Sequence, residues 1–340
     1  MQIESLLRAK VPPTEIARLV GCHHSTVYRE IRRGRYSHLN TDYTTTFRYS
    51  ATKGDAWASF NRTTQGAQPK IGNDRKFAAF CAEMLKDGYS PAAILMYIKE
   101  HNLSFRTRVC RATLYNYVYK GMFLGVTEKH LLRQGRLRKA TKRKQERKAP
   151  LRGRSIEERP QEVLYRSVFG HWEMDSVIGK AETKETLLVF TERKTRMQLV
   201  FRSNKTAAAT VTVLDLLEKK LGKSFSKIFR TITCDNGSEF AYTVELERNN
   251  RTAVYYCHPF CSSERGSNEN QNAFLRRFIR KGSPIEQYTD DQIKQAADFI
   301  NDYPRAIFDG KSARQLFESE LSILAPEILQ KNLDFFRKTT

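Results

Sequence analysis

The amino-acid sequence predicts an α/β domain in its C-terminal half, built on a mixed β-sheet with flanking helices, and all-α helix-turn-helix modules at its N-terminus. From about residue 161 onward, apolar runs of strand length alternate with helical patterns. Before residue 121, apolar residues recur at helical spacing between Gly and Pro breaks. A net charge of +22, from 59 basic and 37 acidic residues, adds the expectation of a polyanionic partner.

Length, apolar content and charge limit the classes of function that the protein can have. With 340 residues, 40% of them apolar, the chain can build two or three domains with real cores. Nucleic acid is the leading candidate for the polyanion. A membrane surface is the weaker one, because we find no basic helix with a clean apolar face. No apolar run approaches the ~18 residues of a membrane span, and residues 1–10 lack a signal-peptide core, so we expect a cytoplasmic protein.

Six cysteines form no CxxC pair, which fits a reducing compartment. The stretch Cys257–Cys261 contains a histidine and could help to hold zinc. Ordinary cysteines beside the end of a strand are the favoured interpretation.

Shifts in pattern and charge divide the chain into five segments. They are a helix-turn-helix module (1–34), a connector rich in polar and aromatic residues (35–72), a second helical module resembling a helix-turn-helix (73–121), a basic linker (122–160) and the α/β domain with C-terminal helices (161–340).

Residues 12–34 carry the helix-turn-helix pattern. Pro12 and Pro13 start a helix whose buried side is supplied by Ile16, Ala17, Leu19 and Val20, and Gly21 breaks it. Ser25 and Thr26 cap or open a second, basic helix that covers 27–33, with Val27 and Ile31 facing the core. The N-terminal side of such a helix presents side chains to the major groove. The candidate DNA-binding residues are therefore His24, Ser25, Thr26, Tyr28, Arg29 and Arg32. A generic amphipathic helix pair is the alternative.

The second helical module contains three expected helices, at 74–85, from Ser90 and Pro91 to about 98, and at 111–120. It is either a second DNA-binding unit or a packing module. The segment 129–154 then holds twelve Lys or Arg and one acid. We expect it to be a clamp that tracks DNA phosphates rather than a solvated linker. Its candidate DNA-binding residues are Arg138, Lys139, Lys142, Arg143 and Lys144.

The α/β domain begins with three apolar runs joined by short turns, which predict an antiparallel meander at 171–178, 187–191 and 197–201. A helix over 206–221 leads to a strand at 228–234, which we expect to run parallel to the first strand because a helical crossover precedes it. A strand at 253–257 and a helix opening at 267 follow.

Three carboxylates stand where a metal site needs them. Asp175 lies near the middle of the first strand, Asp235 ends the parallel strand, and Glu269 opens the last of these helices. Ligands gather at the carboxyl ends of such strands. Carboxylates in this arrangement can hold two Mg²⁺ ions for in-line displacement at a phosphodiester. Rival acids are Glu173, Glu239 and Glu264.

We expect this helix to run through Phe278, and helical spacing places positions 269, 273, 276 and 280 on one of its faces. Arg276 and Arg280 would then hold DNA phosphates beside Glu269. A surface helix with ordinary ion pairs is the alternative.

These residues resemble the IS thirty (IS30) family of bacterial insertion-sequence transposases, of the DDE class. The resemblance covers nearly the whole chain. It rests on the N-terminal helix-turn-helix and on four motifs, 171–175, 235–240, 264–272 and 301–305. The 33 residues that separate Asp235 from Glu269 match the family's spacing and select Glu269 over Glu264. Met174, Ser263 and Arg280 stand where the family usually has Gly, Trp and Pro, and none of them removes an expected metal ligand.

The resemblance implies a ribonuclease H-like catalytic fold in which Asp175, Asp235 and Glu269 bind Mg²⁺, with Mn²⁺ able to substitute. It implies recognition of terminal inverted repeats and a cut that leaves a 3′-OH. That 3′-OH would attack a second phosphodiester, giving a joined intermediate and then integration into target DNA. Two ends must be brought together, so a homodimer or larger assembly on DNA is expected.

Two other classes stay open. A DNA-binding regulator with an inactive nuclease-like domain would share the fold and need no metal. A retroviral-type integrase or a nuclease would share the fold too, although the N-terminus lacks the integrase's His-His-Cys-Cys module.

Overall fold

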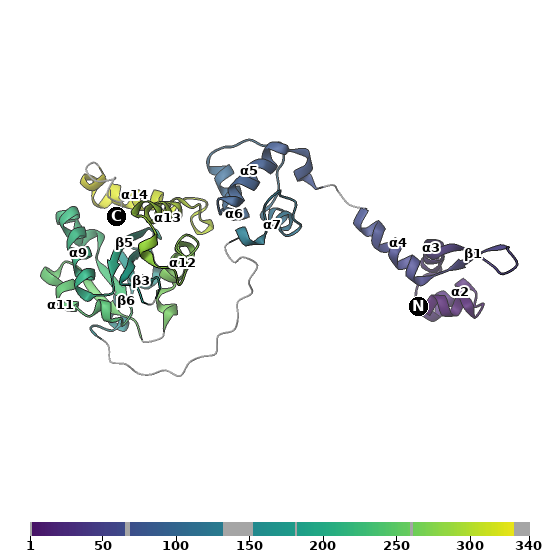
Figure 1. Cartoon of the computed structure of the whole chain (residues 1–340), viewed down its shortest axis with the longest axis horizontal. Coiled ribbons are helices and arrows are strands. Elements are labelled where there is room, and N and C mark those ends of the chain that lie inside the picture. The colour runs from purple at the N-terminus through teal and green to yellow at the C-terminus, as the bar shows by residue number, and fades with distance from the viewer. Residues whose placement is uncertain (1, 65–68, 132–151, 181, 259–260, 330–340) are drawn as a thin grey trace. The chain divides into compact units, whose positions relative to one another are not determined.

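The computed structural model describes residues 2–64, 69–131, 152–180, 182–258 and 261–329 (Figure 1). The chain divides into two compact units, Met1–Asn73 and Asp74–Thr340. The basic residues Arg138, Lys139, Lys142, Arg143 and Lys144 lie outside the described residues.

The first unit opens with three short helices, α1 (Gln2–Arg8), α2 (Pro13–Val20) and α3 (His24–Gly34). Gly21 ends α2 in the left-handed conformation, with φ of 72°. Ile16, Ala17 and Val27 form the buried centre of the predicted helix-turn-helix. Two details of the prediction were wrong. Leu19 is 59% exposed, and α3 starts at His24 because the His23 ring, not Ser25 or Thr26, caps it.

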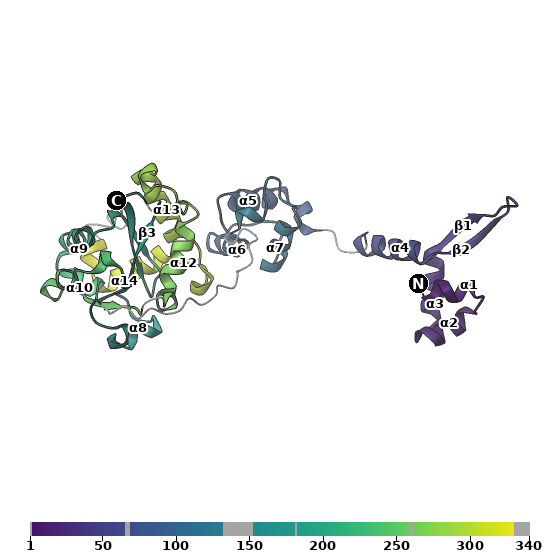
Figure 2. The same cartoon turned by 60° about the horizontal axis from the view of Figure 1, so that its bottom comes forward.

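Residues 35–72 contain a hairpin and a helix. Strands β1 (Arg35–Leu39) and β2 (Thr45–Tyr49) pair antiparallel, and α4 (Ala51–Thr64) and a 3-10 helix, η1 (Lys70–Asn73), follow (Figure 2). Gly34 is buried where α3 meets the end of this hairpin.

The second unit opens with the three predicted helices, α5 (Arg75–Lys86), α6 (Pro91–Glu100) and α7 (Arg111–Tyr119). Asp74 and Ser90 cap α5 and α6 with their side chains. The backbone N–H of Ser90 donates to the Tyr303 hydroxyl at 2.8 Å, and the Tyr89 and Tyr303 rings stack at 5.3 Å. This module therefore packs on the C-terminal part of the same unit.

The centre of the second unit is a five-stranded sheet in the order β5-β4-β3-β6-β7. Its strands are β3 (His171–Ile178), β4 (Glu185–Glu192), β5 (Gln198–Asn204), β6 (Thr231–Cys234) and β7 (Ala253–Tyr256). The first three form the predicted antiparallel meander, and β6 and β7 run parallel to β3. This order confirms the expected ribonuclease H-like mixed sheet. The predicted start of β6 at Ile228 was wrong, because Phe225–Ile228 forms the short helix α10.

Helices cover both faces of the sheet, with α9 on one side and α12 and α13 on the other in both views (Figures 1 and 2), and α11 lies on the side of α9 (Figure 1). These helices are α9 (Ala207–Leu221), α11 (Thr243–Leu246), α12 (Gly266–Leu275) and α13 (Asp290–Asp302). The remaining α-helices are α8 (Glu162–Tyr165) and α14 (Ala313–Leu324). Short 3-10 helices lie at Glu128–His130, Ile156–Glu158, Gly222–Ser224, Ser238–Phe240, Arg248–Asn250, Ser262–Arg265, Ile285–Gln287 and Ala306–Phe308.

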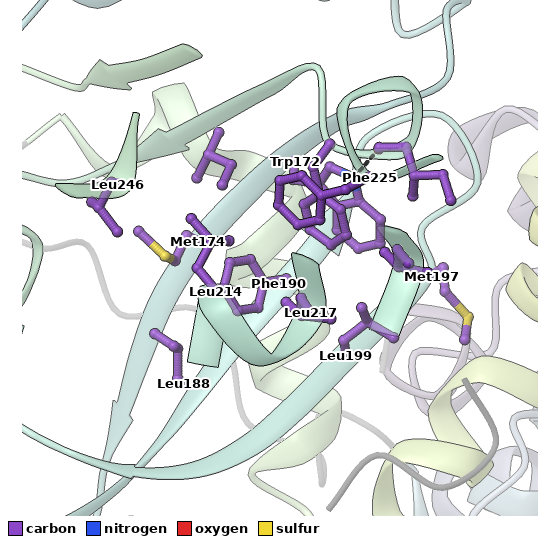
Figure 3. Close-up of a cluster of buried hydrophobic side chains, with 14 of the residues drawn as sticks. Trp172, Met174, Leu188, Phe190, Met197, Leu199, Leu214, Leu217, Phe225 and Leu246 are labelled. Atoms are coloured by element: carbon purple, nitrogen blue, oxygen red, sulfur yellow. Dashed lines mark hydrogen bonds between the residues drawn. The ribbon is translucent and has the colours of Figure 1, made fainter. Parts of the chain in front are cut away.

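Alternation along the strands divides the core in two. Trp172, Met174 and Phe190 pack with Leu214 and Leu217 of α9 (Figure 3). Their neighbours Val177, Leu187 and Val189 instead pack with α12 and α13 on the opposite face. Asp175 shares the side of Val177, so the sheet turns it toward α12.

The described part of the chain contains no helix that is both long and apolar enough to cross a membrane.

Replacing Gly34 with Ala tests the junction between α3 and the hairpin. An added Cβ would lie 2.5 Å from the carbonyl oxygen of Ser50 and closer still to the Tyr49 ring. We expect Gly34→Ala to lower the unfolding free energy of the first unit by about 1–3 kcal/mol, because backbone must move. Gly72→Ala, with no atom within 4 Å of its Cβ, is the control for chemical denaturation. Equal stability of the two variants would contradict this packing.

Candidate active site

The parallel pairing of β3 and β6 brings the first two predicted carboxylates together. Glu173 on β3 is level with Thr233 on β6. Asp175 and Asp235 each follow two residues later in the sequence and lie on the same side of the sheet. Asp175 is half-buried on the strand, and Asp235 follows the last residue of β6.

A single guanidinium joins these two carboxylates. Arg265 lies 2.9 Å from Asp175 and 3.0 Å from Asp235, one ion pair through each terminal nitrogen. Burial lowers the pKa of Arg265, but the two aspartates outweigh burial and raise it above its ordinary value. Burial raises the pKa of Asp175, and Arg265 opposes that rise. Two carboxylates therefore lie close together and share one guanidinium as their counter-charge.

Other donors orient the same carboxylates. The Asn272 amide donates to Asp175 Oδ2 at 2.7 Å, and the Ser176 N–H donates to Asp175 Oδ1 at 3.0 Å. The Gly237 N–H donates to Asp235 Oδ1 at 3.1 Å. Arg265 and Asn272 were not singled out from the sequence. Both residues lie in the motif 264–272, in which only the acids are candidate ligands by their chemistry.

Glu269, the third predicted carboxylate, lies in the first turn of α12 and is exposed. It is one helical turn before Asn272, which reaches Asp175. Among the described residues, however, no three His, Cys, Asp or Glu side chains lie close enough to hold a metal ion. Arg265 thus links Asp175 to Asp235, and no such link to Glu269 is found among the described residues.

The rival acids have other partners. Glu173 is fully buried, pairs with Arg193 and accepts from the Asn268 N–H at 2.9 Å. Glu264 lies 2.8 Å from His258 Nδ1. Glu239 lies in the 3-10 helix Ser238–Phe240 just beyond Asp235. Glu173 therefore ties β3 to the start of α12 instead of facing a ligand.

The predicted extension of α12 through Phe278 was wrong. The helix ends at Leu275, where Arg276 caps it, so the shared face does not continue to Arg280. The chain turns here, which brings Ile279 and Ile285 into the core on this side of the sheet. Arg276 donates to the Ile178 carbonyl at 2.7 Å, and Arg280 is exposed beyond the helix.

The predicted reading face of α3 is open to solvent. His24, Thr26, Tyr28, Arg29 and Arg32 are exposed, and Ser25 is half-buried. Arg29 donates to the Ser25 hydroxyl at 3.0 Å, which orients its guanidinium along the helix.

Residues 1–34 match the helix-turn-helix domain family. The whole chain is similar to curated transposases. It is 31% identical to a probable transposase for the insertion-like sequence element IS1161 of Streptococcus salivarius, over 93% of this chain and 92% of the relative. It is 31% identical to the transposase for IS4351 of Bacteroides fragilis, over 89% of each. It is 27% identical to the transposase InsI for IS30C of Escherichia coli (strain K12), over 95% of this chain and 82% of the relative.

Solved structures with a similar arrangement include the catalytic core domain of BIV integrase, 16% identical with a TM-score of 0.34, over 45% of this chain and 97% of that one. Another is the HTLV-2 integrase catalytic core domain in complex with magnesium, 17% identical with a TM-score of 0.33, over 44% of this chain and 97% of that one.

A helix-turn-helix domain ahead of a mixed sheet that bears paired aspartates is the arrangement of a DNA transposase. This chain belongs to the IS30 family of insertion-sequence transposases.

Glu173→Gln separates a structural acid from a candidate ligand. The change leaves Arg193 buried without its counter-charge, so we expect the second unit to lose about 3–5 kcal/mol of stability. Glu269→Gln alters an exposed side chain and should stay within about 0.5 kcal/mol of the wild type. Metal-free chemical unfolding of both variants measures this difference. A stable Glu173→Gln protein would return Glu173 to the candidate ligands.

Proposed function

We propose that the chain binds the terminal inverted repeats of its element and catalyses metal-dependent strand cleavage and strand transfer. The observation that carries this proposal is the convergence of Asp175 and Asp235, from neighbouring parallel strands, on one cation beside the helix that bears Glu269. Membership of the family supports the same proposal, because the 33 residues between Asp235 and Glu269 match the spacing expected for that family.

The donor set fits Mg²⁺, for which Mn²⁺ can substitute. Both carboxylates already share one positive charge, and hard carboxylate oxygens are the ligands that Mg²⁺ prefers. We propose Asp175, Asp235 and Glu269 as ligands. Bound Mg²⁺ would polarise the phosphodiester and activate the attacking oxygen.

Residues of the chain would prepare this site. Asn272 and the Ser176 N–H fix the orientation of Asp175. Arg265 pairs with both aspartates in the absence of metal, so it competes with any cation that needs the same oxygen atoms. A metal ion that binds Asp175 Oδ1 or Asp235 Oδ2 would displace the corresponding ion pair.

Two parts of the protein would bind DNA, one contacting bases in the major groove and the other contacting backbone phosphates. The exposed side chains of α3 would enter the major groove, with the half-buried Ser25 beside them; they are His24, Thr26, Tyr28, Arg29 and Arg32. The basic linker, Arg276 and Arg280 would hold phosphates. Because two element ends must be joined, we propose a homodimer or larger assembly on DNA, acting on the bacterial nucleoid in the cytoplasm.

Asp235→Asn tests the catalytic part. A supercoiled plasmid that carries the gene and its flanking DNA is incubated with Mg²⁺ and wild-type or variant protein, and cut and joined ends are mapped by sequencing. We expect junctions at flanking inverted repeats with the wild type. We expect at least a ~100-fold loss with the variant, because a metal ligand is removed, and DNA binding should be unchanged. Binding without any metal-dependent product from the wild type would favour the regulator with an inactive nuclease-like domain.

Neutralising Arg138, Lys139, Lys142, Arg143 and Lys144 tests the clamp. We expect weaker binding to every DNA sequence and a shallower dependence of log K on log salt, since each lost phosphate contact reduces the slope by about 0.9. Anisotropy titrations at several salt concentrations measure it. An unchanged slope would make the segment a linker only.

A further inference from the structure

A cavity of about 470 Å³ lies on the opposite side of α12 from Asp175. Three arginines line it, Arg166, Arg196 and Arg305, together with the start of α12 at Gly266 and Ser267. No acidic side chain is among the described residues of its wall. The cavity belongs to neither the aspartate pair nor the reading face of α3.

The three arginines come from separate parts of the fold. Arg166 follows α8 and is exposed, Arg196 lies in the turn between β4 and β5, and Arg305 lies in the loop after α13. Arg196 donates to the Ser267 hydroxyl, and Arg305 donates to Gln271 Oε1 at 3.0 Å. Both interactions point the guanidinium groups at α12. Arg305 Nε is buried and has no hydrogen-bond partner in the described part of the chain.

Gathering these charges is unfavourable in the absence of an anion. Burial, with the neighbouring charge of Arg166, lowers the pKa of Arg196 to about 10, although Glu173 and Glu192 oppose the shift. Burial likewise lowers the pKa of Arg305 to about 10, with Arg196 as the neighbouring charge. Arg166 and Arg196 also adopt positive φ angles of 54° and 65°, which are uncommon for residues other than glycine.

The cavity and the proposed reaction centre are connected by α12, which contributes residues to both. Asn270 lines the cavity and Asn272 contacts Asp175, so the two sites share one helix. At about 3.6 residues per turn, the Glu269 side chain leaves α12 between these two directions. A DNA strand whose reacting phosphate is held near Glu269 would therefore have a neighbouring phosphate within reach of the arginines.

We propose that Arg166, Arg196 and Arg305 form a binding site for a backbone phosphate of the DNA next to the reacting phosphodiester. The inference rests on the proposed function, because it takes the strand to run past Glu269. Planar guanidinium forks match phosphate oxygens. The site assigns a role to the motif 301–305, which the metal centre does not use.

The test measures DNA binding by the full-length protein without metal. Arg166→Gln and Arg305→Gln are compared with Arg248→Gln, which removes an exposed, ion-paired arginine outside the cavity. Fluorescence anisotropy of a labelled duplex from the plasmid's flanking DNA is recorded over a range of salt concentrations. Each cavity variant should reduce the slope of log K against log salt by about one, and Arg248→Gln should keep the wild-type slope.

Three further results decide the interpretation. Arg305→Lys keeps the charge and should retain most of the slope, which separates lost charge from a lost fold. Wild-type slopes in both Gln variants would overturn the proposal. Inorganic phosphate is the second probe. If it raises the melting temperature of the wild type but not of Arg305→Gln, while the DNA slopes stay equal, the site binds a free anion and the DNA assignment is wrong.

This outcome is separable from that of the catalytic proposal. Asp235→Asn should abolish joining and leave the metal-free salt slope unchanged. If the wild type joins DNA but the cavity variants keep the wild-type salt slope, only the proposed phosphate site is contradicted. A shallower slope in those variants with no joined product from the wild type would sink the proposed catalysis alone.

Discussion

The buried carboxylate of Glu173 is the interaction on which the rest of the site depends. It pairs with Arg193 from the turn after β4 and accepts the N–H of Asn268 at the start of α12. Through this ion pair and this hydrogen bond, the Glu173 carboxylate joins the central strand to a turn and to the helix that carries Glu269. Once α12 is held there, Arg265 and Asn272 can both reach Asp175. Breaking a buried pair leaves an uncompensated charge, so this link tolerates little change.

Much of the fold could be predicted from the sequence because strand alternation and helix caps are local signals. The meander follows from such signals, and the parallel direction of β6 follows from the helical crossover before it. The end of α12 could not be predicted, since Phe278 and Ile279 fit a continued helix as well as a turn. The partners of Asp175 were equally hidden, because Arg265 and Asn272 reach it only once α12 packs on β3.

Positive charge in this protein has two kinds of environment. On α3 the arginines are exposed to solvent, so their guanidinium groups can enter a DNA groove without first leaving a buried position. Around α12 it is partly buried, with Arg265 neutralised by two aspartates and Arg196 and Arg305 lining a wall without acids. The first kind suits recognition and the second suits positioning, because buried charges demand a partner of opposite sign at a defined place.

The most direct test of the account is whether the three acids bind a divalent cation. Mn²⁺ binding to full-length protein without DNA can be titrated by electron paramagnetic resonance for the wild type, Asp175→Asn, Asp235→Asn and Glu269→Gln. The account predicts a Mn²⁺ site in the wild type that each substitution weakens by at least about tenfold. Variants that bind Mn²⁺ as tightly as the wild type would contradict it and leave Arg265 as the only cation these aspartates hold.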